Sequence, residues 1–266
     1  MATALHQSPI YGPVHSRRIG ISLGINLMPA DGKACTFDCI YCECGFNAER
    51  KPHLPRPTRE QVRETLEHKL RGMQQEGTIP DVLTFAGNGE PTSHPQFAEI
   101  IDDTIALRDK YFPQAKVSVL SNATFAHRPE VHAALMRVDN NILKLDTCSN
   151  EYIKMVDRPA SSHYSVNDII NTLASFKGHV IIQTMFIKGT FDRQNVDNTS
   201  DTYVTPWLKA LRHIAPQEVM IYTIDRDTPA PKLSKASRHE LNTIRDRVAA
   251  MGIACTASYY WAQQGN

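Results

Sequence analysis

Four of the six cysteines of this 266-residue chain are crowded into ten consecutive residues. They are Cys35, Cys39, Cys42 and Cys44, within the stretch KACTFDCIYCECG. Crowded thiols are either joined in disulfides or hold a metal. Disulfides persist in oxidising compartments, whereas thiols stay reduced in the cytoplasm. The chemistry of the cluster therefore depends first on where the protein works.

Composition and hydropathy favour a cytoplasmic protein. Hydrophobic residues make up 41% and charged residues 21% of the chain, and a chain of this length buries a core that needs no disulfides. No apolar run reaches the 18 residues that a membrane span needs. The stretch MATALHQSPIYG lacks the charged start and apolar centre of a signal peptide. We therefore expect a cytoplasmic protein without a membrane partner, whose clustered cysteines bind metal or act in catalysis.

The spacing of the first three cysteines favours an iron–sulfur cluster over zinc. Cys35, Cys39 and Cys42 follow a C-x3-C-x2-C pattern, whereas tetrahedral zinc sites usually use two C-x2-C pairs or one pair with distant histidines. Each iron of a 4Fe–4S cube takes one external ligand, normally a thiolate. Three cysteines on one loop would leave the fourth iron open to a substrate or cofactor. Cys44 is too close to Cys42 to hold that iron, so we interpret it as a buried thiol, with a reactive thiolate as the alternative.

The rest of the chain alternates between short apolar runs and amphipathic segments. The runs are rich in β-branched residues and nearly continuous, which is typical of parallel strands buried on both faces. Strands are predicted at 21–27, 81–87, 116–122, 141–147, 179–186, 218–225 and 252–259.

Start signals for helices lie between these runs. A Ser or Thr followed three residues later by Glu or Gln forms a capping box, and proline suits the first helical position. Capping boxes begin at Thr58 and Ser237, and Thr205-Pro206 supplies an N-cap followed by a proline. Other helices are expected to start at Ser165, after Pro95 and after Pro129.

Strands that alternate with helices form either a doubly wound sheet or a barrel. Nearly every predicted strand ends in polar residues, among them Asn122 and Asp146, and Glu90 comes after the strand at 81–87. Active sites gather at the carboxyl ends of all strands in a barrel, but at one switch point in a doubly wound sheet. Six or seven strands are too few to close an eight-stranded barrel, so we predict one α/β domain over 1–266, an open partial TIM-like barrel with mainly parallel strands. Its parts are an N-terminal segment with the first strand (1–30), the cysteine loop (31–48), the βα units (49–235) and a C-terminal helix and strand (236–266).

The cysteine pattern, with Tyr41 directly before the third cysteine, resembles the signature of the radical S-adenosylmethionine (SAM) superfamily. The resemblance implies a partial (β/α)6 barrel, an oxygen-sensitive 4Fe–4S cluster on Cys35, Cys39 and Cys42, and SAM bound by its amino and carboxylate groups to the fourth iron. It also implies that an electron cleaves the SAM sulfonium, and that the 5′-deoxyadenosyl radical then takes a hydrogen atom from a substrate. An electron donor such as flavodoxin or ferredoxin would be a partner.

Two further stretches resemble SAM-binding motifs of that superfamily. GNGEP at 87–91 is similar to its GGEP motif, which implies that Gly89 and Glu90 hold the SAM ammonium, since glycine allows close backbone approach and a carboxylate complements the cation. Asn88 replaces the first glycine of that motif. LSNAT at 120–124 is similar to its TNG strand end, which implies that Asn122 binds the ribose or carboxylate of SAM.

The resemblance also assigns SAM contacts farther along the chain. Asp146 in KLDT is an acceptor suited to ribose hydroxyls, and Tyr41 joins the cofactor contacts. The stretch VMIYTID corresponds to the last barrel strand, where the backbone near Tyr222 and Ile224 would face the adenine.

Candidates for substrate contact are less specific. GPVHSRRIGISLGINLMP resembles the N-terminal segment of stand-alone radical SAM proteins that are loosely similar to tRNA wyosine-base synthases. There Arg17 is either exposed or pairs with an anionic substrate or the SAM carboxylate. Lys188 in FIKG is similar to a lysine that those synthases use with pyruvate, although a solvated loop lysine is favoured. Arg226 is expected at the barrel mouth, and Cys44 completes the catalytic candidates.

The substrate stays open between a small molecule, a peptide and a tRNA base. A formal net charge of +1 and the lack of an added RNA-binding domain speak against tRNA. A non-catalytic zinc or iron–sulfur interaction protein is the alternative of another class. Polar residues at several strand ends argue against it, because a scaffold needs no convergent polar mouth.

Overall fold

The computed structural model describes residues 4–16 and 20–259, which fall into two compact units. The N-terminal unit comprises Ala4–Asp38 and Cys44–Leu143, and the C-terminal unit comprises Cys39–Glu43 and 144–259. The cysteine loop therefore contributes to both units. The prediction of one domain over 1–266 stays a prediction.

The strands of the N-terminal unit pair in the order β1-β2-β3-β4-β5. The pairs from β2 to β5 are parallel, and β1 joins the edge of β2 in antiparallel orientation. Phe85 is in register with Ile25 and with Val119, so the segments that follow these strands leave from one edge. The strands are β1 (Ile10–Ser16), β2 (Gly20–Ile25), β3 (Val82–Phe85), β4 (Lys116–Ser121) and β5 (Asn140–Lys144).

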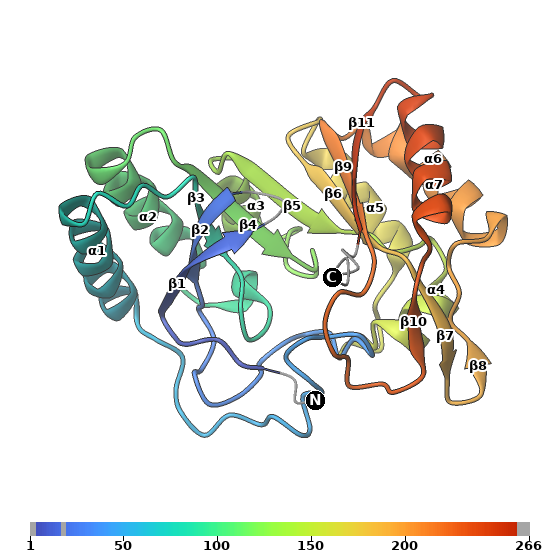
Figure 1. The fold of residues 1–266 in the computed structure, drawn as a ribbon, viewed down its shortest axis with the longest axis horizontal. Helices are drawn as coiled ribbons and strands as arrows, with labels where there is room; N and C mark the ends of the chain where they lie inside the picture. Colours follow the sequence, from blue (N-terminus) through green and yellow to red (C-terminus); the bar gives the residue numbers. More distant parts are fainter. Residues whose placement is uncertain (1–3, 17–19, 260–266) are drawn as a thin grey trace, which may run out of the picture. The chain divides into compact units, whose positions relative to one another are not determined.

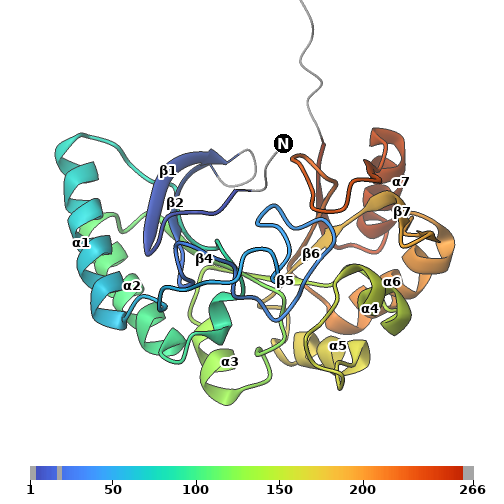
Figure 2. The ribbon, with the colours of Figure 1, turned by 90° about the horizontal axis from the view of Figure 1, so that it is seen from below.

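The helices of the N-terminal unit lie outside its strands (Figures 1 and 2). The capping box predicted at Thr58 is present, with the Thr58 hydroxyl accepting from the Gln61 N–H at 3.2 Å. Phe97 packs edge to face on Phe85 with ring centroids 6.1 Å apart, which joins a helix to the strand layer. The helices are α1 (Arg59–Gln75), the 3-10 turn η1 (Pro91–Ser93), α2 (Phe97–Tyr111) and α3 (Pro129–Leu135).

The C-terminal unit has three parallel strands in the order β6-β9-β11 and a small antiparallel sheet in the order β10-β7-β8. Phe186 packs edge to face on Trp207 with ring centroids 5.6 Å apart in its core. The strands are β6 (Ile181–Met185), β7 (Ile187–Phe191), β8 (Gln194–Asn195), β9 (Glu218–Tyr222), β10 (Leu233–Lys235) and β11 (Ala254–Ser258). The helices are α4 (Asn150–Val156), α5 (Val166–Ser175), α6 (Asp201–Ile214) and α7 (Arg238–Ala249).

The seven predicted strands are confirmed as β2, β3, β4, β5, β6, β9 and β11. The helix starts predicted at Ser165 and Ser237 are confirmed, each with its side-chain cap. The start predicted at Thr205-Pro206 is wrong, because α6 begins at Asp201 with Ser200 as its N-cap. The added turn places Val204 on the same buried face as Trp207, and this packing outweighs the hydrogen bond that proline cannot donate.

The small sheet β10-β7-β8, the helix α4 and the edge strand β1 have no counterpart in the sequence prediction. Among residues 4–16 and 20–259, none of the helices is both long and apolar enough to cross a membrane.

Candidate active site

Glu90 is a buried carboxylate that joins two strand ends of the N-terminal unit. Its side chain is 2% exposed and lies between the end of β3 and η1. One oxygen, Oε1, accepts from the Thr92 N–H at 3.0 Å, from the Thr92 hydroxyl and from the Ser121 hydroxyl at 2.7 Å. The other, Oε2, accepts from the Asn122 N–H at 2.7 Å. Burial raises the pKa of Glu90, although these donors act in the opposite direction.

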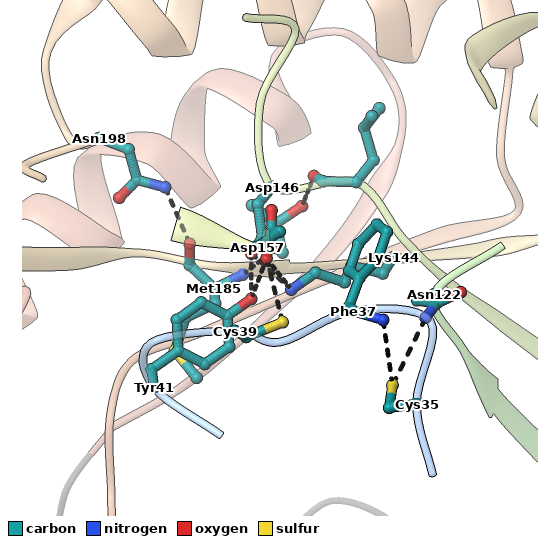
Figure 3. A network of polar contacts seen from close by, with 12 residues as sticks. Cys35, Phe37, Cys39, Tyr41, Asn122, Lys144, Asp146, Asp157, Met185 and Asn198 are labelled. Carbon is teal, nitrogen blue, oxygen red and sulfur yellow. Dashed lines mark hydrogen bonds and ion pairs between the residues drawn. The ribbon is translucent and has the colours of Figure 1, made fainter. Parts of the chain in front are cut away.

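The thiol of Cys35 lies against donors from the same unit (Figure 3). The Phe37 N–H donates to its Sγ at 3.4 Å and the Asn122 side-chain amide donates at 3.7 Å. Asn122 also donates from Nδ2 to the Thr36 hydroxyl at 2.8 Å. Its Oδ1 accepts from the N–H and the hydroxyl of Thr124 at 3.1 and 2.7 Å. The predicted SAM ligand Asn122 thus contacts a predicted cluster ligand.

Gly89 is glycine because the cysteine loop passes against it. Its φ is +149°, and a Cβ there would lie 2.0 Å from the carbonyl oxygen of Ala34, closer than any side chain tolerates. Asn88, the departure from the family motif, is fully buried. It accepts from the His6 N–H at 2.7 Å and donates to the carbonyls of His6 and Pro29, each at 2.9 Å. Asn88 therefore secures the N-terminal segment.

Two residues that sequence reasoning missed close the cysteine loop within the N-terminal unit. Lys33, 3% exposed, donates from Nζ to the carbonyl oxygen of Gly45 at 2.7 Å. Asn47 donates from Nδ2 to the carbonyl oxygens of Cys35 and Phe37, both at 3.2 Å. The only sequence signal for either is its place at a flank of the cysteines.

A second polar group lies in the C-terminal unit and centres on Asp157 (Figure 3). Asp157 Oδ1 accepts from the Tyr41 hydroxyl at 3.0 Å, pairs with Lys144 Nζ at 3.0 Å and lies 3.4 Å from Cys39 Sγ. Lys144 also pairs with Asp146 Oδ2 at 2.6 Å, which accepts from the Tyr41 hydroxyl as well. The network ties the cysteine loop to the end of β5 and of α4.

Burial and charge oppose each other in this network. Lys144 Nζ lies 4.5 Å from the centroid of the Tyr41 ring, a cation–π contact. Burial opposes the charge of Lys144, but Asp146 and Asp157 outweigh it and raise its pKa well above the ordinary value. Burial raises the pKa of Asp157, against the charge of Lys144. Asp157 Oδ2 is buried without a hydrogen-bond partner in the described residues.

Asp146 takes its backbone contact from a neighbouring strand. Its Oδ1 accepts from the Met185 N–H at 2.9 Å, at the end of β6. Asp146 was predicted at a strand end, whereas Lys144 and Asp157 carried no sequence signal. Asp157 is the C-cap of α4, so only folding brings it to the strand ends.

The remaining cysteines of the loop differ in exposure. Cys44 is 6% exposed, and its Sγ lies 3.5 Å from the carbonyl oxygen of Gly87, as the buried-thiol interpretation expects. Cys42 is half-buried, and its N–H donates to the carbonyl oxygen of Cys39 at 3.1 Å. All six cysteines lie within the described residues, and none is in a disulfide.

Arg226, on the loop after β9, lies against the cysteine loop. It pairs with Glu43 at 2.8 Å, and both side chains are exposed. A second contact joins the same two loops, since the Ala230 N–H donates to the carbonyl oxygen of Ile40 at 3.2 Å. Within the C-terminal unit, Arg226 therefore lies beside the cysteine loop, and its predicted role as a substrate contact stays a prediction.

Lys188 lies in β7 and is ion-paired, so the favoured interpretation as a solvated loop lysine is wrong. Its Nζ lies 2.6 Å from Glu240 Oε1 and 3.6 Å from Asp197 Oδ2. The hydrogen bond to Glu240 raises the pKa of Lys188, so the side chain is a paired ammonium.

Tyr222 ends β9, and its carbonyl oxygen accepts from the Phe186 N–H at 2.8 Å.

Ile224 is 7% exposed in the loop after β9, and Arg17 lies outside the described residues.

The predicted cluster ligands are thiols, a ligand type that holds iron–sulfur clusters or zinc. Cys35, Cys39 and Cys42 are half-buried thiols, and the sulfur of Cys35 accepts two N–H hydrogen bonds of the kind that tune cluster thiolates. In residues 4–16 and 20–259, no group of three or more His, Cys, Asp or Glu side chains is already gathered to hold a metal ion.

Comparisons with known proteins agree with this chemistry. Residues 31–197 match the family model described as the Radical SAM superfamily. A UPF0026 protein of Helicobacter pylori strain 26695 is 34% identical over 233 residues, covering 85% of this chain and 70% of that protein.

Two solved structures show the same fold. A radical SAM methyltransferase from Sphaerobacter thermophilus superposes with a TM-score of 0.66 at 16% identity, covering 90% of this chain and 66% of that one. The structure of TYW1 with a lysine-pyruvate adduct bound superposes with a TM-score of 0.59 at 14% identity, covering 93% of this chain and 78% of that one. The chain thus spans just under two thirds of the methyltransferase. These likenesses confirm the predicted fold class, an open α/β partial barrel with mainly parallel strands.

Proposed function

The chain belongs to the radical SAM superfamily of enzymes, and on that premise we propose that it cleaves SAM reductively and abstracts a hydrogen atom from a substrate. Cys35, Cys39 and Cys42 would hold the 4Fe–4S cluster. The observation that carries this proposal is the Cys35 sulfur, which accepts from the Phe37 N–H and from Asn122. Such donors stabilise the thiolate that binds iron.

Free acceptor sites on two carboxylates support the assigned SAM contacts. An ionised carboxylate offers about four acceptor sites. Among the residues that the structure describes, Glu90 Oε2 accepts one hydrogen bond, from Asn122, so it has a site for the SAM ammonium, whose charge would offset the cost of burying the carboxylate. In the same part of the chain, Asp146 Oδ1 accepts one, from Met185, and has a site for a ribose hydroxyl.

The cluster, when bound, supplies one electron to SAM. The chain's own residues have other tasks. Gly89 lets the cysteine loop approach the GNGEP segment, and Tyr41 ties the loop tip to Asp157. The backbone at Tyr222 and Ile224 would receive the adenine. A donor such as flavodoxin or ferredoxin would deliver the electron, and a cytoplasmic location would keep the thiols reduced.

For the substrate we propose Arg226 as a contact, because it is 66% exposed and lies beside the cysteine loop. Lys188 suits a covalent role less well. An amine must lose its proton before it attacks a carbonyl, and Glu240 raises the pKa of Lys188. A small anionic molecule, a peptide and a tRNA base remain candidate substrates, and a formal net charge of +1 speaks against the last.

Anaerobic purification tests the proposal. We expect brown protein with about four irons per chain and formation of 5′-deoxyadenosine when SAM and a reductant are added. A colourless preparation holding one zinc would instead support a non-catalytic interaction protein.

A further inference from the structure

We propose that Asn122 is a positioning residue for the cluster ligand Cys35, and that its amide tunes how readily the cluster is reduced. The inference rests on the proposed function and deepens it. It assigns Asn122 to the sulfur of a ligand, where the family motif assigns a contact with SAM. Asn122 Nδ2 lies 3.7 Å from Cys35 Sγ, a hydrogen bond to a sulfur acceptor.

The surroundings of Asn122 decide which end of its amide faces the sulfur. Oδ1 accepts from the N–H of Thr124 at 3.1 Å and from its hydroxyl at 2.7 Å. A backbone N–H can only donate, so Oδ1 must lie on that side and Nδ2 on the other. Nδ2 then divides its two hydrogens between the Thr36 hydroxyl, at 2.8 Å, and Cys35 Sγ.

The same residue is held at its backbone. The Asn122 N–H donates to Glu90 Oε2 at 2.7 Å, and Asn122 is 8% exposed. A buried amide that is bonded at both ends and at its backbone has little freedom to turn toward a ligand. Asn122 therefore links the buried carboxylate of the GNGEP segment to the first cysteine of the loop.

A donor on a cluster thiolate favours the reduced state. Reduction adds one negative charge to the cluster, and N–H groups directed at its sulfurs stabilise that charge. The Phe37 N–H supplies one such donor to Cys35 and Asn122 supplies the second. Loss of the second donor should make the cluster harder to reduce, with an effect that exists before SAM binds.

The test is a dithionite titration of the cluster-loaded protein without SAM. Asn122→Asp replaces the donor with an acceptor and keeps the size and the bonds from Thr124. At a fixed applied potential we expect the ratio of reduced to oxidised cluster to fall about tenfold, or about 59 mV for a one-electron couple.

Asn140→Asp is the matched control. Asn140 donates to the Ser118 hydroxyl at 2.9 Å. Ser118 lies in β4, and the extended chain from it to Asn122 spans about 13 Å at 3.3 Å per residue. The control makes the same chemical change in the same unit and should leave the ratio unchanged.

An unchanged ratio in Asn122→Asp with weakened SAM binding would overturn the inference, because Asn122 would then act on SAM. If Asn122→Asp fails to load iron while Asn140→Asp loads it, the same titration is carried out on Thr124→Val. It removes one bond that orients the amide, so a smaller shift in the same direction supports the inference and no shift overturns it. A wild-type protein that holds no cluster would overturn the proposed function instead.

Discussion

The Tyr41 hydroxyl donates to Asp157 at 3.0 Å, although the two residues are 116 positions apart in the chain. Tyr41 precedes the third cysteine of the loop, and Asp157 ends α4. This bond connects the cysteine loop, the predicted site of the iron–sulfur cluster, to the buried polar network of the C-terminal unit.

Tyr41→Phe should weaken that connection. The change removes the hydroxyl that is hydrogen-bonded to Asp146 and Asp157. Leaving a buried acceptor without its donor lowers the free energy of unfolding by about 1–3 kcal/mol. Urea denaturation measures the loss. Tyr203→Phe is the control. It also removes a tyrosine hydroxyl but keeps the ring that packs on Tyr152 with centroids 4.9 Å apart. Equal stability of wild type and Tyr41→Phe would show that the bond contributes nothing.

Lys144→Met should destabilise the fold more strongly. Asp146 and Asp157 would be left buried without their shared cation, and breaking a buried pair by removing one partner costs about 3–5 kcal/mol. Denaturation at pH 7 checks this. Lys154→Met, at the end of α4, should have little effect in comparison because surface charges contribute little.

Serine variants of the three predicted cluster ligands should contain less iron than the serine variant of Cys44. Serine at position 35, 39 or 42 removes a thiolate from the cluster, so each variant should lose most of its iron. Cys44→Ser should keep it, because Cys44 faces the Gly87 carbonyl. Iron and sulfide assays after anaerobic loading decide, and iron loss only in Cys44→Ser would reverse the assignment.

Glu90→Gln should weaken SAM binding about tenfold or more, since a hydrogen bond to a charged group contributes about 1.5–3 kcal/mol. Calorimetry on cluster-loaded protein measures the affinity. Glu99→Gln on the exposed face of α2 is the control. Unaltered affinity in Glu90→Gln would leave Glu90 a purely structural link between β3 and β4.

The Lys188–Glu240 pair predicts a pH dependence. Burial raises the pKa of Glu240, but the Lys188 hydrogen bond outweighs it, and the pKa falls from 4.5 to about 2. A lowered pKa gives stability above about pH 4.5 that is lost as the pH falls toward 2. Glu240→Gln keeps the capping box, so it should cost about 1 kcal/mol at pH 7 and nothing near pH 2. Thermal melts at both values test this, and a pH-independent difference would contradict it.

Local signals predicted most of the elements. The capping boxes at Thr58 and Ser237 depend on four consecutive residues and were confirmed. The predicted start of α6 at Thr205-Pro206 was not confirmed. Ser200, farther back in the chain, is also a suitable N-cap residue, and the tertiary packing of Val204 favours the start that follows Ser200.

The sequence by itself determined the family and the positions of seven strands along the chain, because cysteine spacing and runs of apolar residues are local properties. Only the tertiary structure decided what each polar residue touches. It placed Asn122 beside the sulfur of Cys35 and Asp157 beside Tyr41. Hydrogen bonds depend on distances between atoms that are far apart in the chain, and the register of the strands and the ends of the helices set those distances.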